Sequence, residues 1–231
     1  MDRLRQGLAF RYGHEGATMA PSKQTATQRK GRQKDAEAAE NTEEKKVAAR
    51  TWRLPGFSEQ TVDGVLRGNA YHGVMQYIRF SCCGSEDGIL GELARLEAEG
   101  FLTAEQVGAV DHRQIAAFFR SDLGKRLLEG AEVLREFKFS ILEEGADLDP
   151  ALAGEKILLQ GVVDCAIVDE DGLIIIDFKT DRVTEETLAQ RAEDYRPQVE
   201  TYRDAMERIF EKKVKQTVLY FFSMDRFAEI L

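Results

Sequence analysis

Two apolar runs joined by an Asp-Gly pair constrain the fold of this chain more than any other feature. The runs Lys156–Val168 and Leu173–Lys179 are rich in Val, Ile and Leu, and such residues favour β-strands. An Asp-Gly pair between two such runs is typical of the tight turn of a β-hairpin. The sequence therefore predicts an antiparallel pair of strands at the centre of the domain.

Three ionisable residues interrupt these apolar runs: Asp164, Asp177 and Lys179. Charged side chains are rare inside such strands unless they have a partner or a function. If the Asp-Gly pair forms a two-residue turn, Asp164 lies opposite Lys179, whereas a four-residue loop places it opposite Asp177. Because side chains alternate with period 2, all three share one sheet face in either register. A three-residue loop would separate them.

Two carboxylates and an ammonium group on one sheet face suit metal-dependent phosphate chemistry. Directly opposite Cβ atoms lie roughly 5 Å apart, so Asp164 and Asp177 are predicted to hold Mg²⁺, with water and a substrate phosphate as further ligands. The cation lowers the pKa of bound water, and Lys179 is expected to orient that water or to stabilise charge on the phosphate. The alternative is an ordinary Asp–Lys cross-strand pair on a solvent-facing strand.

The remaining pattern predicts helices before the hairpin, and a helical region and a strand after it. Helical spacing begins at Gly68, and a period-2 strand follows at Val133–Ile141. Pro197 is expected to open a helix that reaches Phe210, which places Gln198 in a first turn where free N–H groups favour phosphate. The other predicted elements are helices at Ile89–Glu99, Thr103–Val110, His112–Arg120, Leu123–Gly130 and Thr184–Glu193, and a last strand at Val214–Phe222. This order predicts an α/β domain with one small mixed β-sheet flanked by helices.

The composition divides the chain into a leader and a domain. Residues Pro21–Arg50 are rich in charged and polar residues with almost no large apolar side chain, as expected of an exposed helix or a flexible arm. We therefore expect residues 1–50 to form a partly ordered leader and residues 51–231 to form the folded domain.

The composition also excludes several classes of protein. No apolar run approaches the ~20 residues that span a membrane. Three cysteines make neither a disulfide framework nor a zinc site, so a reducing cytoplasm fits best. The net charge of −9 argues against a protein that binds nucleic acid by bulk charge alone, but it does not exclude a nuclease, because an acidic metal site is itself a cluster of carboxylates. The chain also lacks a Gly-x-x-x-x-Gly-Lys-Ser/Thr nucleotide-binding loop.

Several motifs, in order, resemble the RecB-like branch of the PD-(D/E)XK nucleases. The hairpin motif of that family is similar to Gly161-Val-Val-Asp164 followed by Asp177-Phe-Lys-Thr-Asp181. Its upstream histidine motif, Glu-bearing strand and downstream Gln/Tyr helix are similar to Gly68-Asn-Ala-Tyr-His72, Arg135-Glu136-Phe-Lys-Phe139 and Gln198-x-x-x-Tyr202. The finer resemblance is to the C-terminal nuclease domain of the AddA subunits of bacterial helicase–nucleases. It implies a PD-(D/E)XK nuclease fold with an N-terminal helical region.

The resemblance also implies a set of site residues. The implied metal ligands are His72, Asp164, Asp177 and the main-chain carbonyl of Phe178. The implied catalytic residues are Asp164, Asp177, Lys179 and Glu136. The implied DNA contacts are Gln198 and Tyr202. The cation is expected to be Mg²⁺, and the imidazole ligand indicates tolerance of Mn²⁺.

Three of these residues have simpler interpretations. A single helical histidine such as His72 is more often a core or surface residue than a ligand. Glu136 fits a solvent-facing strand residue that pairs with Arg135 or Lys138. Tyr202 fits a stripe of core residues along its helix.

The resemblance further implies a nuclease domain that processes double-strand breaks for recombinational repair. The substrate would be single-stranded DNA, delivered by a helicase part upstream in the same polypeptide, and an AddB-type subunit would be the partner. One alternative is a stand-alone exonuclease of the same superfamily. The other is a nuclease-fold scaffold without catalysis that binds DNA or a partner subunit.

Overall fold

A mixed β-sheet of six strands organises the chain, and the computed structural model describes residues 22–27, 62–147 and 150–230. The predicted leader lies outside the described residues apart from 22–27. The strands are β1 (Lys23–Thr25), β2 (Val133–Glu144), β3 (Lys156–Asp169), β4 (Gly172–Lys179), β5 (Val214–Phe221) and β6 (Arg226–Glu229).

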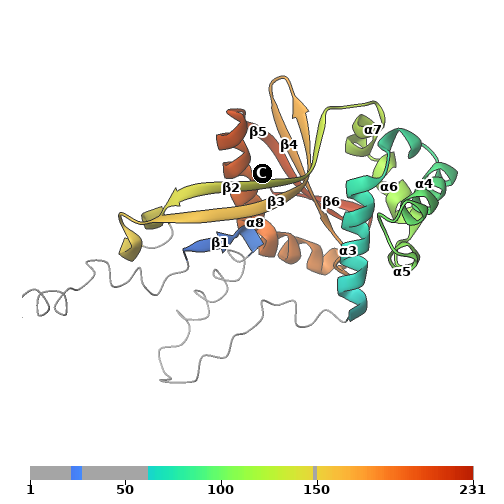
Figure 1. Ribbon diagram of the computed structural model, residues 1–231, viewed down its shortest axis with the longest axis horizontal. Helices are drawn as coiled ribbons and strands as arrows, with labels where there is room; N and C mark the ends of the chain where they lie inside the picture. The colour runs from blue at the N-terminus through green and yellow to red at the C-terminus, as the bar shows by residue number, and fades with distance from the viewer. Residues whose placement is uncertain (1–21, 28–61, 148–149, 231) are drawn as a thin grey trace, which may run out of the picture.

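Strand β3 is 14 residues long, so different parts of it pair with three neighbouring strands. It pairs in parallel with β1 over residues 158–160, antiparallel with β4 over 165–169, and antiparallel with β2 along most of its length. Beyond the β4 pairing, β2 and β3 continue as a long two-stranded arm with β1 beside it (Figure 1). On the other side, β4 pairs in parallel with β5, and β5 pairs antiparallel with β6.

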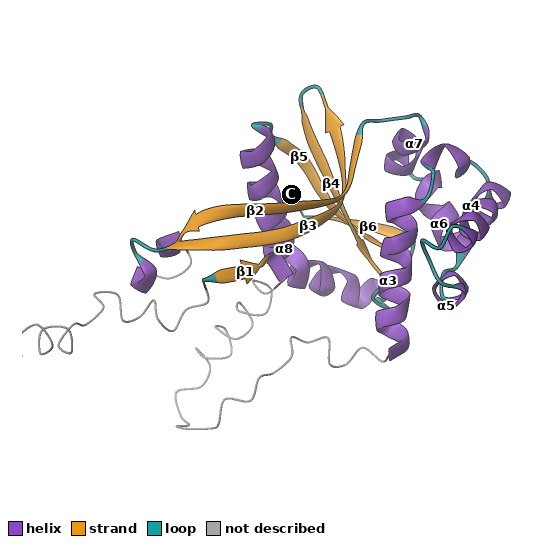
Figure 2. Cartoon of the chain, viewed as in Figure 1, coloured by secondary structure: helices purple, strands orange, loops and turns teal. Residues whose placement is uncertain are grey.

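Helices cover both faces of the sheet, as Figure 2 shows. The α-helices are α3 (Val62–Tyr77), α4 (Glu86–Ala98), α5 (Ala104–Gly108), α6 (His112–Arg120), α7 (Asp122–Leu128) and α8 (Glu185–Phe210). The first five pack on one side, where Phe118 meets Phe178 and Tyr220 in edge-to-face contacts. Helix α8 covers the other side through residues such as Val199 and Tyr202. The sheet is therefore buried between two apolar layers. In each layer, the burial of one large apolar side chain stabilises the fold by ~1.5–3 kcal/mol.

The central hairpin is confirmed, and the register decides which residues face each other. Val168 pairs with Leu173 and Asp169 with Gly172, so the turn is formed by residues 170 and 171. This is the register predicted for the four-residue loop, with Asp169 and Gly172 forming one additional pair. It places Asp164 opposite Asp177. The three ionisable residues of the hairpin therefore meet, as the alternation predicts.

Two predicted helix starts are wrong. Helix α3 begins at Val62 instead of Gly68. Its first turns expose side chains such as Val65, so they carry no apolar stripe from which the earlier start could have been predicted. Pro197 lies inside α8 and does not begin a helix. A proline inside a helix removes one N–H donor and kinks the axis, and Figure 1 shows α8 as two limbs that meet at an angle.

The short strands β1 and β6 were not predicted, since three or four residues carry too little periodicity to recognise. In contrast, the helices at 86–128 agree with the prediction to within a few residues. Among the described residues, no helix is both long and apolar enough to cross a membrane.

Candidate metal centre

The predicted site residues converge where β2 and β3 leave the main sheet, between α3 and α8 (Figure 1). Five elements contribute to this region: His72 comes from α3, Glu136 from β2, Asp164 from β3, Asp177 and Lys179 from β4, and Gln198 and Tyr202 from α8. Residues from distant parts of the sequence therefore share one small volume.

Three of these side chains form a compact ligand set. His72 Nδ1 lies 3.3 Å from Asp164 Oδ2 and 3.9 Å from Glu136 Oε1. One potential ligand atom from each residue lies within 4.8 Å of the other two. The histidine side chain is 34% exposed and the Asp164 side chain only 10%, so the set is open to solvent on the α3 side.

Glu136 reaches this set through an unusual backbone conformation. Its φ is +47°, in the left-handed region that side chains other than Gly rarely adopt. The β2–β3 ladder pairs Arg135 with Cys165 and Phe137 with Val163, and it skips Glu136. Backbone strain of this kind, worth ~1–3 kcal/mol, is concentrated at functional sites. The Glu136 carboxylate lies 3.9 Å from His72 Nδ1, and among the described residues it forms no ion pair with the predicted partners Arg135 and Lys138.

Arg135 ties the strand that bears Glu136 to the helix that bears His72. Its Nη1 donates to the carbonyl oxygens of Gln76 at 3.1 Å and Ile78 at 2.6 Å, at the end of α3, where helix carbonyls lack helical partners. Its guanidinium also lies 3.6 Å from the ring centroid of Phe80. The relative position of His72 and Glu136 is therefore fixed by this one side chain and the packing around it.

Asp177 and Lys179 lie directly beside the ligand set. Asp177 is 1% exposed, and Lys179 Nζ lies 2.5 Å from its Oδ2. The main-chain N–H of Phe178 donates to Asp164 Oδ2 at 2.8 Å, which ties β4 to β3 at the site. The structure thus brings Phe178 beside Asp164, while the role of its carbonyl as a ligand stays a prediction.

Gln198 and Tyr202 lie beneath the lysine and are buried. Gln198 donates to the Tyr202 hydroxyl at 2.7 Å, and Lys179 Nζ donates to Gln198 Oε1 at 3.5 Å. Because α8 begins at Glu185, Gln198 does not lie in a first turn, so free N–H groups no longer support the predicted phosphate contact, and its contact with DNA stays a prediction. Gly161 permits this packing, because a Cβ there would lie 2.4 Å from the Phe139 ring and 3.2 Å from Tyr202.

Burial and charge act in opposite directions on the site carboxyl groups. Burial raises the pKa of Asp177 to about 6, against the opposing charge of Lys179. Burial, with help from the charge of Asp164, raises the pKa of Glu136. For Asp164, burial is outweighed by the charge and hydrogen bond of His72, which lower its pKa. For His72, burial is outweighed by Asp164, which raises the pKa of the imidazole.

The residues present fit a divalent cation. Two carboxylates and one imidazole are a suitable donor set for Mn²⁺ and a weaker one for Mg²⁺. Burial is the main reason that the pKa values of Glu136 and Asp177 are raised, and a cation beside them would favour their ionised forms. Glu136, predicted at the edge of the site, is one of the three residues of the ligand set. Asp177, predicted as a ligand, lies beside this set and pairs with Lys179.

Sequence reasoning missed one residue beside the lysine. The Tyr195 ring centroid lies 4.1 Å from Lys179 Nζ, and its hydroxyl donates to Asp181 at 2.7 Å. Tyr195 precedes Gln198 by three positions, so both lie on one helix face. This spacing was the available signal, but the assumed helix start at Pro197 concealed it.

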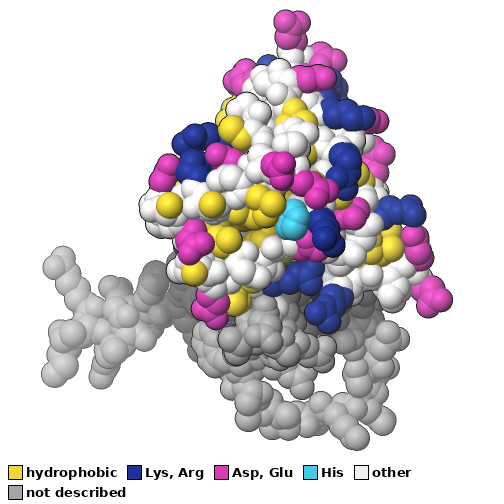
Figure 3. All heavy atoms as spheres, turned by 90° about the vertical axis from the view of Figure 1, so that its right-hand side faces the viewer, with side chains coloured by type: hydrophobic (Ala, Val, Ile, Leu, Met, Phe, Trp, Pro, Cys, Tyr) yellow, Lys and Arg dark blue, Asp and Glu magenta, His cyan; other side chains and the backbone are white. Residues whose placement is uncertain are grey.

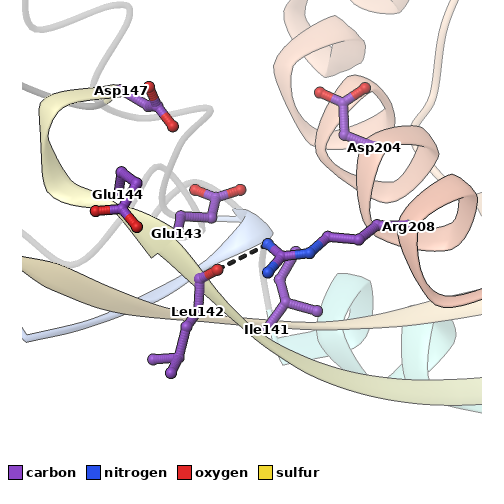
Figure 4. A pocket seen from close by; sticks show the side chains of 7 residues that line it. All are labelled: Ile141, Leu142, Glu143, Glu144, Asp147, Asp204 and Arg208. Carbon is purple, nitrogen blue, oxygen red and sulfur yellow. Dashed lines mark hydrogen bonds between the residues drawn. The ribbon is translucent and has the colours of Figure 1, made fainter.

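A hollow at the far end of the β2–β3 arm is a poor candidate for phosphate chemistry. Its volume is about 240 Å³, and Figure 4 shows that its polar lining is mostly acidic. The lining residues are Ile141, Leu142, Glu143, Glu144, Asp147, Asp204 and Arg208. The single guanidinium of this lining donates to the Leu142 carbonyl at 2.7 Å, so the carboxylates around it would repel a phosphate.

The surface beside the helical layer has mixed charge. Among the described residues on the face at the right of Figure 1, acidic and basic side chains are interspersed without a continuous basic band (Figure 3). DNA affinity from this face is therefore expected to be modest.

Comparison with known proteins finds one nuclease family and several helicase/nuclease subunits that are similar to this chain. A family profile described as the PD-(D/E)XK nuclease superfamily matches residues 46–229. An ATP-dependent helicase/nuclease subunit from Bacillus cereus (strain Q1) is 34% identical over 234 residues, covering 96% of this chain and 19% of that protein. The proteins of the same name from Moorella thermoacetica and Clostridium botulinum (strain Langeland) are 38% and 35% identical, covering 93% and 99% of this chain and 15% and 18% of their own lengths. The chain spans about a fifth or less of these relatives.

Proposed function

This chain belongs to the PD-(D/E)XK nuclease superfamily, and we propose that it hydrolyses phosphodiester bonds of single-stranded DNA with a divalent cation. The observation that carries the proposal is the ligand set of His72, Glu136 and Asp164 within 4.8 Å, with the Asp177–Lys179 pair beside it. A scaffold that only binds a partner has no need of this combination.

His72, Asp164 and Asp177 would hold the cation, with Glu136 as a further carboxylate of the ligand set and the Phe178 carbonyl as a further ligand. Mg²⁺ is the proposed ion, and Mn²⁺ would serve as well because of the imidazole. When bound, the cation supplies Lewis acidity that lowers the pKa of water and stabilises charge on the phosphate.

Lys179 is the residue proposed to act on the attacking water. Its ammonium lies at the edge of the ligand set, where its N–H donors orient a water in line with the scissile bond or stabilise charge on the phosphate. Gln198 accepts a hydrogen bond from the ammonium and donates one to Tyr202, and both residues are proposed to support contact with the DNA strand. The products would be a 5′-phosphate and a 3′-hydroxyl.

The substrate is proposed from the charge of the chain and from its relatives. A net charge of −9 and mixed surface charge allow only modest affinity for DNA. The name of the relatives joins a helicase to a nuclease, so we propose that a helicase part of the same polypeptide feeds single-stranded DNA to this site. High local concentration of the strand would then replace binding affinity. An AddB-type partner, a role in double-strand-break repair and a cytoplasmic location belong to the same proposal.

The test is gel cleavage of matched single-stranded and blunt double-stranded oligonucleotides by the full chain, with Mg²⁺ or Mn²⁺, without ATP and over a range of salt concentrations. The variants are Asp177→Ala and Lys179→Ala, and Asp204→Asn is the control because its carboxylate is exposed. We expect weak, salt-sensitive cleavage of the single strand by the wild type and the control. Neither site variant is expected to cleave.

Two results would contradict the proposal in different ways. Equal cleavage by the wild type and Asp177→Ala would remove the metal site from the chemistry. Efficient, salt-insensitive cleavage of blunt duplex would instead indicate a stand-alone nuclease that needs no helicase.

A further inference from the structure

Resting on the proposed function, we propose that Tyr195 is a positioning residue for Lys179. Its ring would hold the ammonium through a cation–π contact, which uses none of the N–H donors that the lysine offers to water and phosphate. No motif noted in the sequence includes Tyr195.

The geometry around Lys179 supports this role. Its Nζ lies 4.1 Å from the Tyr195 ring centroid, 2.5 Å from Asp177 Oδ2 and 3.5 Å from Gln198 Oε1. The first contact is with a ring face, which attracts a cation without accepting a directed hydrogen bond. The Gln198 contact uses one N–H donor, and the Asp177 contact is an ion pair. Tyr195 thus attracts the charge without using a donor.

The ring is held in place from its hydroxyl end. The Tyr195 hydroxyl donates to Asp181 Oδ2 at 2.7 Å. Arg191 donates to the other carboxylate oxygen through Nε at 3.2 Å and Nη2 at 2.5 Å. Ser223 donates its hydroxyl to the Asp181 carbonyl at 2.6 Å. The tyrosine therefore presents one fixed face to the lysine.

The contact between Lys179 and the Tyr195 ring is needed when a cation is bound. Without a cation, Asp177 is the strongest attraction for the ammonium, because the two groups lie in contact and are nearly buried. An ion bound to Asp177 would withdraw charge from that carboxylate and repel the lysine. The Tyr195 face keeps the ammonium at the site when its attraction to Asp177 weakens. The residue thus acts through Lys179 and touches neither the cation nor the DNA.

The experiment separates the ring face from the shape of the side chain. The full chain cleaves a single-stranded oligonucleotide, with kcat, KM and the half-saturating Mn²⁺ concentration measured for Tyr195→Phe and Tyr195→Leu. A second series places phenylalanine and its mono-, di- and trifluorinated analogues at position 195, since fluorine weakens the ring face at nearly constant shape. Lys179→Ala is the inactive reference. Tyr77→Leu is the control, because Tyr77 packs on Phe101 outside the site.

We expect Tyr195→Phe to keep kcat within about threefold, while Tyr195→Leu lowers it about tenfold, with KM and the Mn²⁺ requirement unchanged. We also expect kcat to fall stepwise with fluorination. The fluorinated series carries the test if Tyr195→Leu does not fold.

The inference alone is overturned if the wild type cleaves, Lys179→Ala does not, and kcat is unchanged by fluorination or by Tyr195→Leu. A fall in kcat accompanied by an equal change in KM or in the Mn²⁺ requirement would also overturn it, because that pattern reports general distortion. A wild type that cleaves no DNA overturns the proposed function and this inference with it.

Discussion

Replacing Asp177 by Asn is expected to stabilise the cation-free chain while abolishing cleavage. The carboxyl group is 1% exposed, and burial raises its pKa from 3.8 to about 6 even though Lys179 is adjacent. Each pKa unit corresponds to about 1.4 kcal/mol, so ionising this group in the folded chain costs up to ~3 kcal/mol. Asparagine has nearly the shape of the protonated carboxyl group and avoids that cost.

The pH dependence gives the sign of the effect. A carboxyl group whose pKa is raised on folding binds a proton more tightly in the folded chain, so this group lowers stability as pH rises from about 4 to 6. The melting temperature of Asp177→Asn is therefore expected to match that of the wild type near pH 4. Above pH 6 it is expected to exceed the wild-type value by up to roughly 6–12 °C, at ~2–4 °C per kcal/mol for a chain of this size.

Thermal unfolding in EDTA and in Mn²⁺ measures both parts of the prediction. Adding Mn²⁺ is expected to raise the melting temperature of the wild type above pH 6 and to leave that of Asp177→Asn nearly unchanged. Asp204→Asn serves as the control, with no pH-dependent difference expected from its exposed side chain. A loss of stability in Asp177→Asn at pH 8 without metal would refute the reasoning, since the pair with Lys179 would then be a structural ion pair.

Three further perturbations test other parts of the site and core. His72→Ala is expected to raise the Mn²⁺ concentration needed for cleavage about tenfold or more with little change in melting temperature, and the opposite pattern would assign His72 to the core. Glu136→Gly is expected to keep or raise the melting temperature, because glycine tolerates the +47° φ, but to weaken Mn²⁺ binding by calorimetry; a clear loss of stability would argue against strain at this position. Of the three cysteines, only Cys82 is expected to react rapidly with a thiol reagent at pH 8, since burial raises the pKa values of Cys83 and Cys165 to about 12; fast labelling of all three in the folded chain would contradict the packing.

The sequence predicted the parts of the fold that depend on local patterns. Alternation located the hairpin and placed Asp164, Asp177 and Lys179 on one face. The helix predicted at Thr103–Val110 forms with a capping box of Thr103 and Gln106 at its start. The family and the fold indicated by the motifs are confirmed by the family match and by the mixed sheet. These features depend on neighbours in the sequence or on a fixed spacing.

The parts that were not predicted depend on tertiary packing. Pro197 favours a helix start locally, but buried residues on both sides of it, such as Tyr195 and Val199, hold α8 together as one kinked helix. The left-handed backbone of Glu136 has no local signal, because it is imposed where strand β2 bends beside α3. The assignment of Arg135 to the end of α3 also needed the position of that helix.

Because Arg135 holds α3 against strand β2, cation binding is expected to depend on whether the helical layer is docked on the sheet. Asp164 and Asp177 meet through a local hairpin, whereas His72 joins them only when the helical layer docks on the sheet through contacts such as that between Arg135 and Ile78, 57 residues apart. Closing such a loop costs entropy that the hairpin alone does not require. An ion that needs His72 and Glu136 together would bind the docked state alone and stabilise it by RT ln(1 + [ion]/Kd). The divalent cation concentration around the protein would then set how firmly its helical layer and its sheet stay joined.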